Sequence, residues 1–229
     1  MNIASLIDHT LLKPTATSAD IDRLCQEAAL HQFCSVCVNP IYVRAATVFL
    51  QNTPVKVCTV IGFPLGANLI ETKATETRSA LRDGAREIDM VLNLGALKDG
   101  KIAAVLMDIQ AVAQLCQSAG AISKVIFETC LLTDAEKILA CDLCITSGVN
   151  FVKTSTGFST AGATVADVAL LSQQVAPHGL GVKAAGGIRS FADFQAMVAA
   201  GATRIGTSAG IKILHEAARP LPGTDGAAD

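Results

Sequence analysis

Short apolar runs alternate with longer amphipathic segments along almost the whole chain. The short runs are rich in Val and Ile and lack a long alternation with polar residues, which is typical of strands buried on both faces. We predict eight such strands, at residues 6–12, 35–39, 55–63, 87–93, 124–128, 149–155, 179–185 and 203–208.

A segment with helical character follows each predicted strand. Ser18, two residues ahead of the acidic Asp20, is a candidate N-cap for the first helix. Pro40 lies near the start of the second helix, and Gly148 is a stop signal for the fifth. The helical segments span residues 17–32, 39–51, 68–84, 99–120, 131–148, 164–177, 190–201 and 208–217.

Eight strand–helix units in a row predict an α/β fold with a parallel sheet. Eight units and 229 residues favour a single (β/α)8 TIM barrel. An open doubly wound sheet is the alternative, but no Gly-x-Gly-x-x-Gly pattern follows the first strand. We assign the barrel to residues 1–215, with a short N-terminal extension, and expect a flexible tail at 216–229, which is rich in Pro, Gly and Ala.

The composition narrows the classes of function. Hydrophobic residues make up 51% of the chain and charged residues 17%, which excludes a disordered protein. The net charge of -2 gives no reason to expect nucleic-acid or membrane binding. No apolar run reaches the roughly 18 residues of a membrane-spanning helix. No basic stretch precedes an apolar core at the N-terminus, so we expect no signal peptide.

Eight cysteines raise the question of a zinc or redox site, because two pairs have Cys-x-x-Cys spacing. These pairs, Cys34/Cys37 and Cys141/Cys144, lie in apolar, structured segments without turn-forming flanks. We therefore expect reduced, structural thiols, no bound metal and a cytoplasmic location.

Two lysines occupy matching positions at the ends of the sixth and seventh predicted strands. Lys153 precedes a hydroxyl-rich turn, and Lys183 precedes a pair of glycines. Active sites of such barrels lie at the C-terminal ends of the strands, and strand residues alternate in direction. If both lysines point inward, they share one cavity with Asp89, which comes from the fourth strand.

This combination suits covalent chemistry on a carbonyl. Neighbouring strands lie about 4.8 Å apart, so the two ammonium groups repel and one is expected to lose its proton near neutral pH. A neutral amine attacks an aldehyde or ketone to form a Schiff base, and Asp89 can move the protons. The alternative is that each lysine forms a buried structural ion pair with Asp89 or Glu128.

The last two loops predict a phosphate site. Gly186 and Gly187 follow the seventh strand, and Thr207 and Ser208 follow the eighth. Barrels often bind phosphate at these loops through backbone N–H groups and the start of a short helix. The alternative is a pair of ordinary turns.

Eight sequence blocks resemble the deoxyribose-phosphate aldolases, which are class I, Schiff-base aldolases. The resemblance runs from about residue 5 to residue 214, in the same order as in that family. The blocks are IDHTLLKP, CVNP, VIGFPLGAN, DGAREIDMVLNLG, KVIFETCLLT, FVKTSTGF, GVKAAGGIR and RIGTSAG.

The resemblance implies a lyase of deoxyribonucleotide and carbohydrate breakdown, with no metal and no organic cofactor. It would cleave 2-deoxy-D-ribose 5-phosphate reversibly to D-glyceraldehyde 3-phosphate and acetaldehyde. Lys153 would be the Schiff-base nucleophile, Lys183 the group that tunes it and exchanges protons, and Asp89 a proton donor and acceptor. The implied substrate and phosphate contacts are Asp8, Thr10, Cys37, Thr156, Gly157, Gly186, Gly187, Gly206, Thr207 and Ser208.

This chain departs from the family pattern in two places. Some members carry a phosphate-binding lysine directly after the glycine of the STG motif, where this chain has Phe158. Some also end in a tyrosine that reaches the site, whereas Tyr42 is the one tyrosine here. A different Schiff-base aldolase acting on phosphosugars, or a non-catalytic phosphosugar-binding barrel, are the alternatives. The expected partners are a small phosphosugar and an aldehyde, together with further copies of the chain in a homodimer or larger oligomer.

Overall fold

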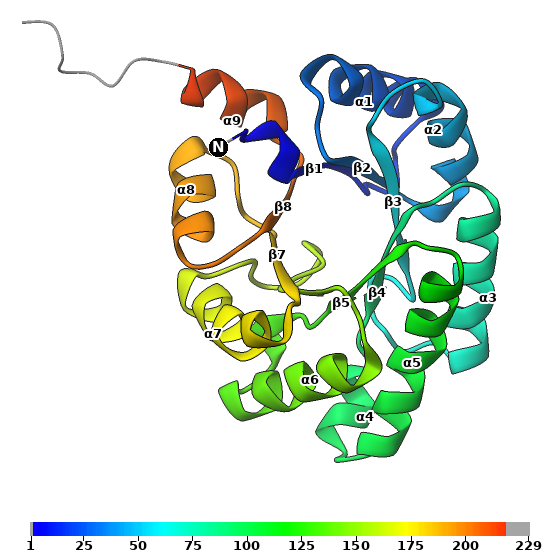
Figure 1. Ribbon diagram of the computed structural model, residues 1–229, viewed down its shortest axis with the longest axis vertical. Coiled ribbons are helices and arrows are strands. Elements are labelled where there is room, and N and C mark those ends of the chain that lie inside the picture. Colours follow the sequence, from blue (N-terminus) through cyan, green and yellow to red (C-terminus); the bar gives the residue numbers. More distant parts are fainter. Residues whose placement is uncertain (1, 219–229) are drawn as a thin grey trace, which may run out of the picture.

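Eight short parallel strands form the centre of the molecule (Figure 1). The structure, a computed structural model, describes residues 2–218. The strands are β1 Ile7–Leu11, β2 Ser35–Val38, β3 Lys56–Ile61, β4 Glu87–Val91, β5 Ile122–Ile126, β6 Phe151–Lys153, β7 Gly181–Ala185 and β8 Arg204–Thr207.

These strands close into a barrel. Each strand pairs in parallel with its neighbour in chain order, and β8 pairs with β1 to complete the ring. The closed ring confirms the predicted (β/α)8 TIM barrel and excludes the open sheet. A short 3-10 turn, η1 Ala4–Leu6, precedes the first strand.

Helices cover the outside of the barrel (Figure 1). Within the described residues, none of them is long and apolar enough to cross a membrane. The α-helices are α1 Ser18–His31, α2 Val43–Leu50, α3 Ile70–Arg82, α4 Leu94–Lys98, α5 Ile102–Ser118, α6 Asp134–Ser147, α7 Val165–Val175, α8 Phe191–Ala199 and α9 Gly210–Ala217. The further 3-10 turns are η2 Pro40–Tyr42, η3 Thr129–Leu131 and η4 Ala176–His178.

The boundaries differ from the predicted ones in a few places. Thr17, not Ser18, is the N-cap of α1: its side chain accepts from the N–H of Asp20, whose carboxylate binds the backbone of Thr17 in return. The five-residue helix α4 was not predicted. Helix α9 extends to Ala217, and residues 219–229 of the predicted tail lie outside the described part of the chain.

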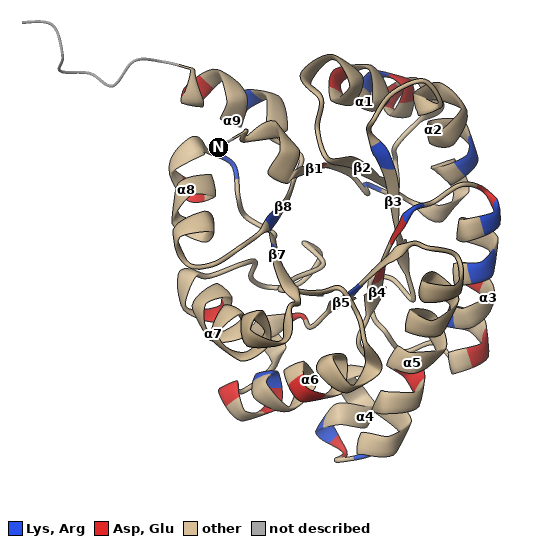
Figure 2. Cartoon of the chain, in the orientation of Figure 1, with Lys and Arg blue, Asp and Glu red and all other residues tan. Residues whose placement is uncertain are grey.

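The two faces of the barrel strands have opposite chemistry. Outward side chains such as Ile88, Val125 and Val152 join one large apolar cluster with the helices. Each such side chain stabilises the fold by about 1.5–3 kcal/mol on burial. The inward face instead carries charged groups, and Figure 2 shows these on the barrel strands as well as on the helices. Since small barrels usually fill their centre with branched apolar residues, a charged interior marks a functional site.

Candidate active site

Lys153 and Lys183 point into the barrel and meet the same carboxylate. They are register partners on β6 and β7. The Nζ atoms of Lys153 and Lys183 lie 2.8 and 2.7 Å from Oδ2 of Asp89. Lys183 also lies 2.5 Å from a carboxylate oxygen of Asp8. The predicted convergence of the two lysines with Asp89 is therefore present, as are the ion pairs that the structural alternative required.

A second set of charges lies beneath these groups. The Lys124 ammonium contacts Oδ1 of Asp89 at 2.8 Å and Glu87 at 2.6 Å. The Arg204 guanidinium contacts Asp8 at 2.8 Å and Glu87 at 2.9 Å. All of these side chains are buried. Sequence reasoning missed Lys124 and Arg204, although each lies on a predicted strand.

These seven side chains form a network that is not electrically balanced. Three carboxylates (Asp8, Glu87 and Asp89) face four cations (Lys124, Lys153, Lys183 and Arg204). A surplus positive charge in a buried site is costly, and release of one proton from a lysine removes it. An arginine does not release its proton, so among these cations only a lysine could do so.

The neighbours of Asp89 and Lys183 show that both side chains are charged at neutral pH. Burial acts to raise the pKa of Asp89, but the ammonium groups of Lys124, Lys153 and Lys183 outweigh it and hold that pKa well below its usual range. Burial acts to lower the pKa of Lys183, but the carboxylates of Asp8 and Asp89 outweigh it and raise that pKa. Asp89 is thus a carboxylate and Lys183 an ammonium at neutral pH.

Burial and ion pairing also oppose one another at Lys124 and Asp8, and ion pairing again keeps both side chains charged. Burial opposes the ionised form of Lys124, yet Asp89 and other neighbours raise its pKa well above the ordinary value. Burial likewise acts against ionised Asp8, yet Lys183, Lys124 and Arg204 lower its pKa. Lys153 differs from the other two lysines because it pairs with a single carboxylate.

A cavity of about 300 Å³ opens at the C-terminal end of the barrel above this network. Lys153 lines it and is the one lysine of the network that does so. The other predicted site residues in the lining are Thr10, Thr156, Gly157, Gly186, Gly187, Gly206, Thr207 and Ser208. Asp8, Cys37, Asp89 and Lys183 do not line the cavity and are fully buried beneath it.

Glu128 supports the rim of the cavity beside Lys153. Its carboxylate accepts a hydrogen bond from the backbone N–H of Thr156 at 3.2 Å and another from the Thr156 hydroxyl. Glu128 has a φ of 52°, a conformation that few residues other than glycine adopt. Glu128 therefore holds the loop after β6, whereas the sequence had suggested it as a partner for a lysine.

The loop after β7, which lines the cavity, has the backbone geometry of an anion site. Gly186 and Gly187 have φ values of 89° and 82°, which a side chain would strain. The Thr207 hydroxyl donates to the carbonyl of Ile188 at 2.7 Å and accepts from the N–H of Ala209 at 2.9 Å. Its hydroxyl is thus used to shape the turn, which leaves Ser208, just before α9, as the better hydroxyl donor.

Two exposed basic residues, Lys13 and Arg189, also line the cavity and were not predicted. Arg189 directly follows the predicted phosphate loop, so its position in the sequence was a usable signal.

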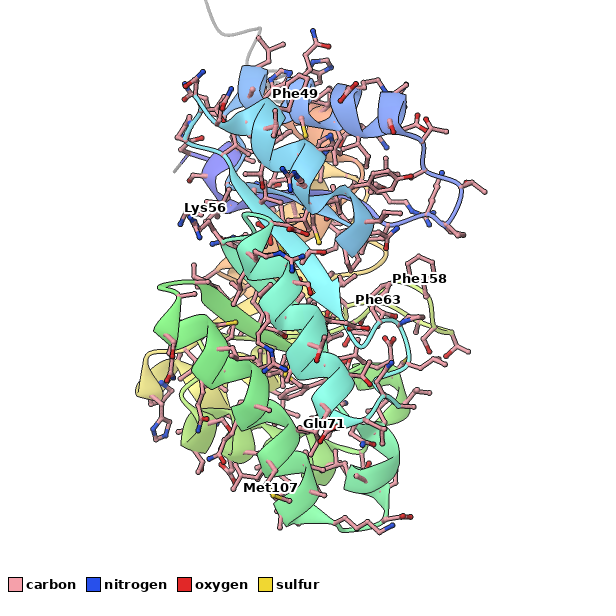
Figure 3. All side chains as sticks on the ribbon, turned by 90° about the vertical axis from the view of Figure 1, so that its right-hand side faces the viewer. Phe49, Lys56, Phe63, Glu71, Met107 and Phe158 are labelled. Atoms are coloured by element: carbon pink, nitrogen blue, oxygen red, sulfur yellow. The ribbon has the colours of Figure 1, made fainter. Side chains whose placement is uncertain are left out.

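Phe158 lines the same cavity and is 50% exposed. Its ring contacts that of Phe63, with centroids 5.3 Å apart, and Figure 3 shows the two beside one another at one end of the barrel.

A larger cavity of about 580 Å³ lies away from the lysines, against α9. Its lining includes His9, Glu27 and His215. His9 Nε2 lies 2.7 Å from Glu27, and the other ring nitrogen has no hydrogen-bond partner. None of the three barrel lysines reaches this cavity, so the smaller cavity is the better candidate for carbonyl chemistry.

All eight cysteines fall within the described residues and are free thiols. Cys141 and Cys144 are buried in α6, as expected for structural thiols. Cys37 lies on β2, and its register partner is Cys58 on β3. The Cys-x-x-Cys spacing with Cys34 is therefore not the contact that matters for Cys37.

Comparisons with known proteins give a consistent family. Residues 3–216 match the model of the DeoC/LacD family aldolases. The chain is 57% identical to a deoxyribose-phosphate aldolase of a Geobacillus species, over 93% of this chain and 95% of that one. It is 58% identical to the enzyme of the same name from Brevibacillus brevis, over 93% and 96%.

Two solved structures have the same architecture. A putative deoxyribose-phosphate aldolase from Coccidioides immitis has a TM-score of 0.92 at 44% identity, covering 94% of this chain and 85% of that one. The tetrameric deoxyribose phosphate aldolase from Aeropyrum pernix has a TM-score of 0.88 at 39% identity, covering 93% and 89%.

Proposed function

The chain belongs to the DeoC/LacD family of aldolases, and from this premise we propose that Lys153 is the amine that attacks the carbonyl carbon of the substrate. The enzyme is an aldolase that cleaves 2-deoxy-D-ribose 5-phosphate to D-glyceraldehyde 3-phosphate and acetaldehyde through a lysine Schiff base. The observation that carries the assignment of Lys153 is its place at the junction of the charged network and the cavity.

The number of ion pairs distinguishes Lys153 from the other two lysines of the network. Lys183 and Lys124 each contact two carboxylates within 3 Å, whereas Lys153 contacts one. Use of Lys153 as the attacking amine therefore breaks the fewest ion pairs. It also leaves three cations against three carboxylates, which is the balanced state of this buried site.

The chemistry then follows from the contacts of Asp89. The Lys153 amine adds to the aldehyde carbon of the open-chain sugar, and loss of water gives a protonated imine. A base removes the proton of the 3-hydroxyl, the C2–C3 bond breaks, and glyceraldehyde 3-phosphate leaves an enamine on Lys153. Protonation of that enamine and addition of water release acetaldehyde. Oδ2 of Asp89, 2.8 Å from the Lys153 Nζ, is placed to exchange protons in these steps.

We assign Lys183 to a supporting role. It is fully buried, contacts both Asp8 and Asp89, and keeps its positive charge at neutral pH. Its charge disfavours a second ammonium group at Lys153. A proton relay between Lys183 and Asp89 is supported by their 2.7 Å contact.

The phosphate group is proposed to bind at the loops that follow β7 and β8. Gly186 and Gly187, whose positive φ values suit glycine, line the cavity and would offer backbone N–H groups, and Ser208 adds a hydroxyl near the start of α9. Arg189 and Lys13 supply positive charge at the opening. These residues compensate for the apolar Phe158 at the position where some relatives have a lysine.

We propose that the enzyme works in the cytoplasm as a homodimer or a larger homo-oligomer. The support for association is an exposed apolar surface on and beside α2. Ile41, Val48 and Phe49 have exposed fractions of 82%, 60% and 43%. Contiguous exposed apolar residues of this kind mark protein interfaces. Eight unpaired thiols support a reducing compartment.

Substitution of the proposed nucleophile tests the assignment. Lys153→Ala is expected to lower turnover of 2-deoxyribose 5-phosphate by more than about 1,000-fold, because the covalent path is lost. The measurement is the release of glyceraldehyde 3-phosphate, with circular dichroism to verify folding. Lys101→Ala, a change at an exposed lysine on the surface, should keep the wild-type rate. A folded Lys153→Ala variant with near-normal turnover would exclude the assignment.

A further inference from the structure

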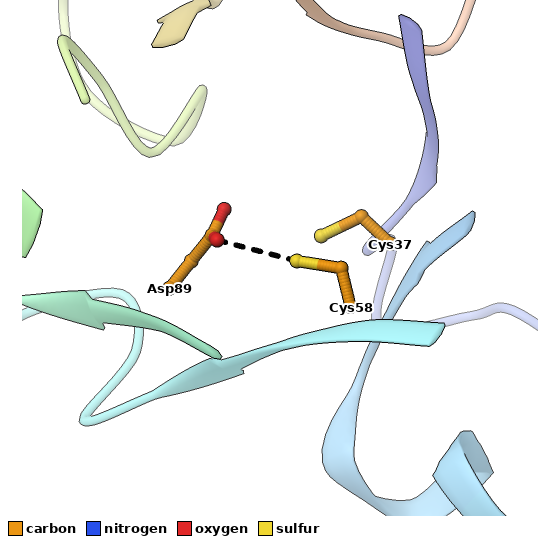
Figure 4. Close-up of side chains that lie close together, drawn as sticks. All are labelled: Cys37, Cys58 and Asp89. Atoms are coloured by element: carbon orange, nitrogen blue, oxygen red, sulfur yellow. Dashed lines mark hydrogen bonds between the residues drawn. The ribbon is translucent and has the colours of Figure 1, made fainter. Parts of the chain in front are cut away.

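Cys37 and Cys58 form a thiol pair inside the barrel that the aldolase chemistry does not use. They are register partners on the parallel strands β2 and β3, and both side chains are fully buried. Their sulfur atoms and a carboxylate oxygen of Asp89 all lie within 4.8 Å of one another. Figure 4 shows the three side chains converging from three consecutive strands.

The contacts of Asp89 divide between its two oxygens. Oδ2 binds the ammonium groups of Lys153 and Lys183. Oδ1 accepts from the Cys58 thiol at 3.2 Å and from Lys124 at 2.8 Å. Cys58 therefore contacts the oxygen of Asp89 that does not contact the proposed nucleophile.

We propose that Cys37, Cys58 and Oδ1 of Asp89 form a binding site for a thiophilic divalent cation of the Zn²⁺ type, and that occupancy of this site inhibits the aldolase. Two thiolates with one carboxylate oxygen are a ligand set that Zn²⁺ and Cd²⁺ prefer over Mg²⁺ or Ca²⁺. Three protein ligands leave the fourth position of a tetrahedral site open. The inhibitory part of the proposal rests on the function proposed above for Asp89.

The surplus positive charge of the network does not oppose such a cation. Binding exchanges one divalent cation for the two thiol protons of Cys37 and Cys58, because metal ligands are thiolates. The net charge of the buried site is therefore the same before and after binding. The charged groups that face the pair are Asp8, Glu87, Asp89, Lys124, Lys153 and Lys183.

A second group of possible ligands is a weaker candidate. Asp8, Cys58 and Glu87 also lie within 4.8 Å of one another. In the first group the competing cation is Lys124, which lies 3.4 Å from Cys58 Sγ and 2.8 Å from Oδ1 of Asp89. In the second group it is Arg204, which contacts both carboxylates and, unlike a lysine, cannot give up its charge to make room for a cation. That group also offers a single thiolate.

The thiol pair has no open contact with solvent, because both side chains are fully buried. Leu12 packs in one apolar cluster with Cys37 and Cys58, and it also lines the cavity. A cation therefore reaches the sulfurs only after neighbouring side chains move, and Leu12 is the cluster member next to the cavity. Binding is expected to be slow, so inhibition should develop with time and should reverse slowly when a chelator is added.

Inhibition follows from the shared carboxylate. A cation on Oδ1 displaces Lys124 and withdraws electron density from Asp89. The carboxylate then accepts protons less readily and pairs less strongly with Lys153 at Oδ2. Turnover should fall even though the cavity itself stays open.

The first test measures binding without reference to activity. Cd²⁺ is titrated into the folded enzyme, and the ultraviolet absorption of cadmium–thiolate bonds is followed. We expect a site of one equivalent that depends on both Cys37 and Cys58, with two protons released on binding. Cys58→Ser should weaken binding by more than about 100-fold, since even outer-shell partners account for 10–100-fold. Cys130→Ser, a change at a half-buried thiol outside the barrel interior, should leave binding intact.

The second test joins binding to turnover. Incubation with Zn²⁺ should reduce turnover at least tenfold in the wild type and in Cys130→Ser, and a chelator should restore it. The residual rate of Cys58→Ser should be insensitive to Zn²⁺.

Absence of a cadmium–thiolate band, or a band that Cys58→Ser retains, overturns the site. Stoichiometric binding without inhibition overturns the inhibitory role. Because the band needs no turnover, failure of the aldolase assignment would not be mistaken for failure of the metal site.

Discussion

Lys153 and Lys183 are paired in register on neighbouring strands, yet their surroundings give them different properties. Lys153 contacts one carboxylate and lines the cavity. Lys183 contacts two carboxylates and is sealed beneath it. The sequence places both side chains on the inner face, but it does not give their depth. The division of roles between the two lysines therefore depends on Asp8, which binds Lys183 and not Lys153.

Replacement of Lys183 should change the pH dependence of the reaction. The pKa of Lys183 is raised, so the wild-type residue is cationic at assay pH and Lys183→Leu deletes a real positive charge. The network then has three cations for three carboxylates, and a neutral amine at Lys153 would leave it negative. The pH profile of turnover should move to the alkaline side by about one to two pH units, as expected for a unit charge a few ångströms away.

The matched control for this shift is a lysine paired outside the barrel interior. Lys137 of α6 contacts Asp134 and Asp167 and is also largely buried. Lys137→Met should leave the pH profile in its wild-type position. A wild-type profile in Lys183→Leu as well would contradict the supporting role of that residue.

Glu128 should affect substrate positioning more than folding. Its carboxylate holds the backbone N–H and hydroxyl of Thr156, three residues after the proposed nucleophile Lys153. Glu128→Ala should lower kcat/KM by about 10–100-fold, because small misplacements of a reacting group carry penalties of that size. Glu128→Gln keeps an acceptor oxygen and should retain more activity. Steady-state kinetics of the two variants test this, and equal losses would argue against a positioning role.

At the level of elements, apolar runs were sufficient to predict all eight strands. Their ends were less predictable. The predicted sixth strand included Thr154 and Ser155, but β6 ends at Lys153. The Thr154 hydroxyl instead donates to the carbonyl of Ala185 and accepts from its N–H. Helix α4 was missed because five residues are too few to show a helical period.

The helical layer contains a buried ion pair that sequence patterns did not indicate. Lys73 of α3 and Asp108 of α5 meet at 2.6 Å, and Lys73 also donates to the carbonyl of Val91. Burial lowers the pKa of Lys73 and raises that of Asp108, so in both cases desolvation outweighs the attraction within the pair. Such a pair joins α3 and α5 without adding much net stability.

Breaking this pair should be more harmful than replacing it. Asp108→Leu alone is expected to lower the free energy of unfolding by about 3–5 kcal/mol, because it leaves the Lys73 ammonium buried without its carboxylate. Lys73→Met with Asp108→Leu should recover most of that loss. Urea unfolding of the single and double variants measures both quantities. A double variant as unstable as the single one would show that the pair itself stabilises the fold.

At the level of the whole molecule, the barrel collects charges from strands that are far apart in the sequence. Alternation along the strands predicted that Lys153, Lys183 and Asp89 would meet. It did not predict that Lys124 and Arg204 would join them. The depth of each inward side chain along the barrel axis is set by the register in which all eight strands pair. The surplus positive charge therefore arises only when the charged side chains of several strands are considered together.

The central claim is that Lys153 forms the covalent bond with the substrate. The direct measurement is borohydride reduction of the enzyme in the presence of acetaldehyde or of 2-deoxyribose 5-phosphate, followed by peptide mass spectrometry. We predict one reduced adduct per chain, on Lys153, with either compound. An adduct on Lys183 or Lys124, or no adduct on the folded enzyme, would contradict the account.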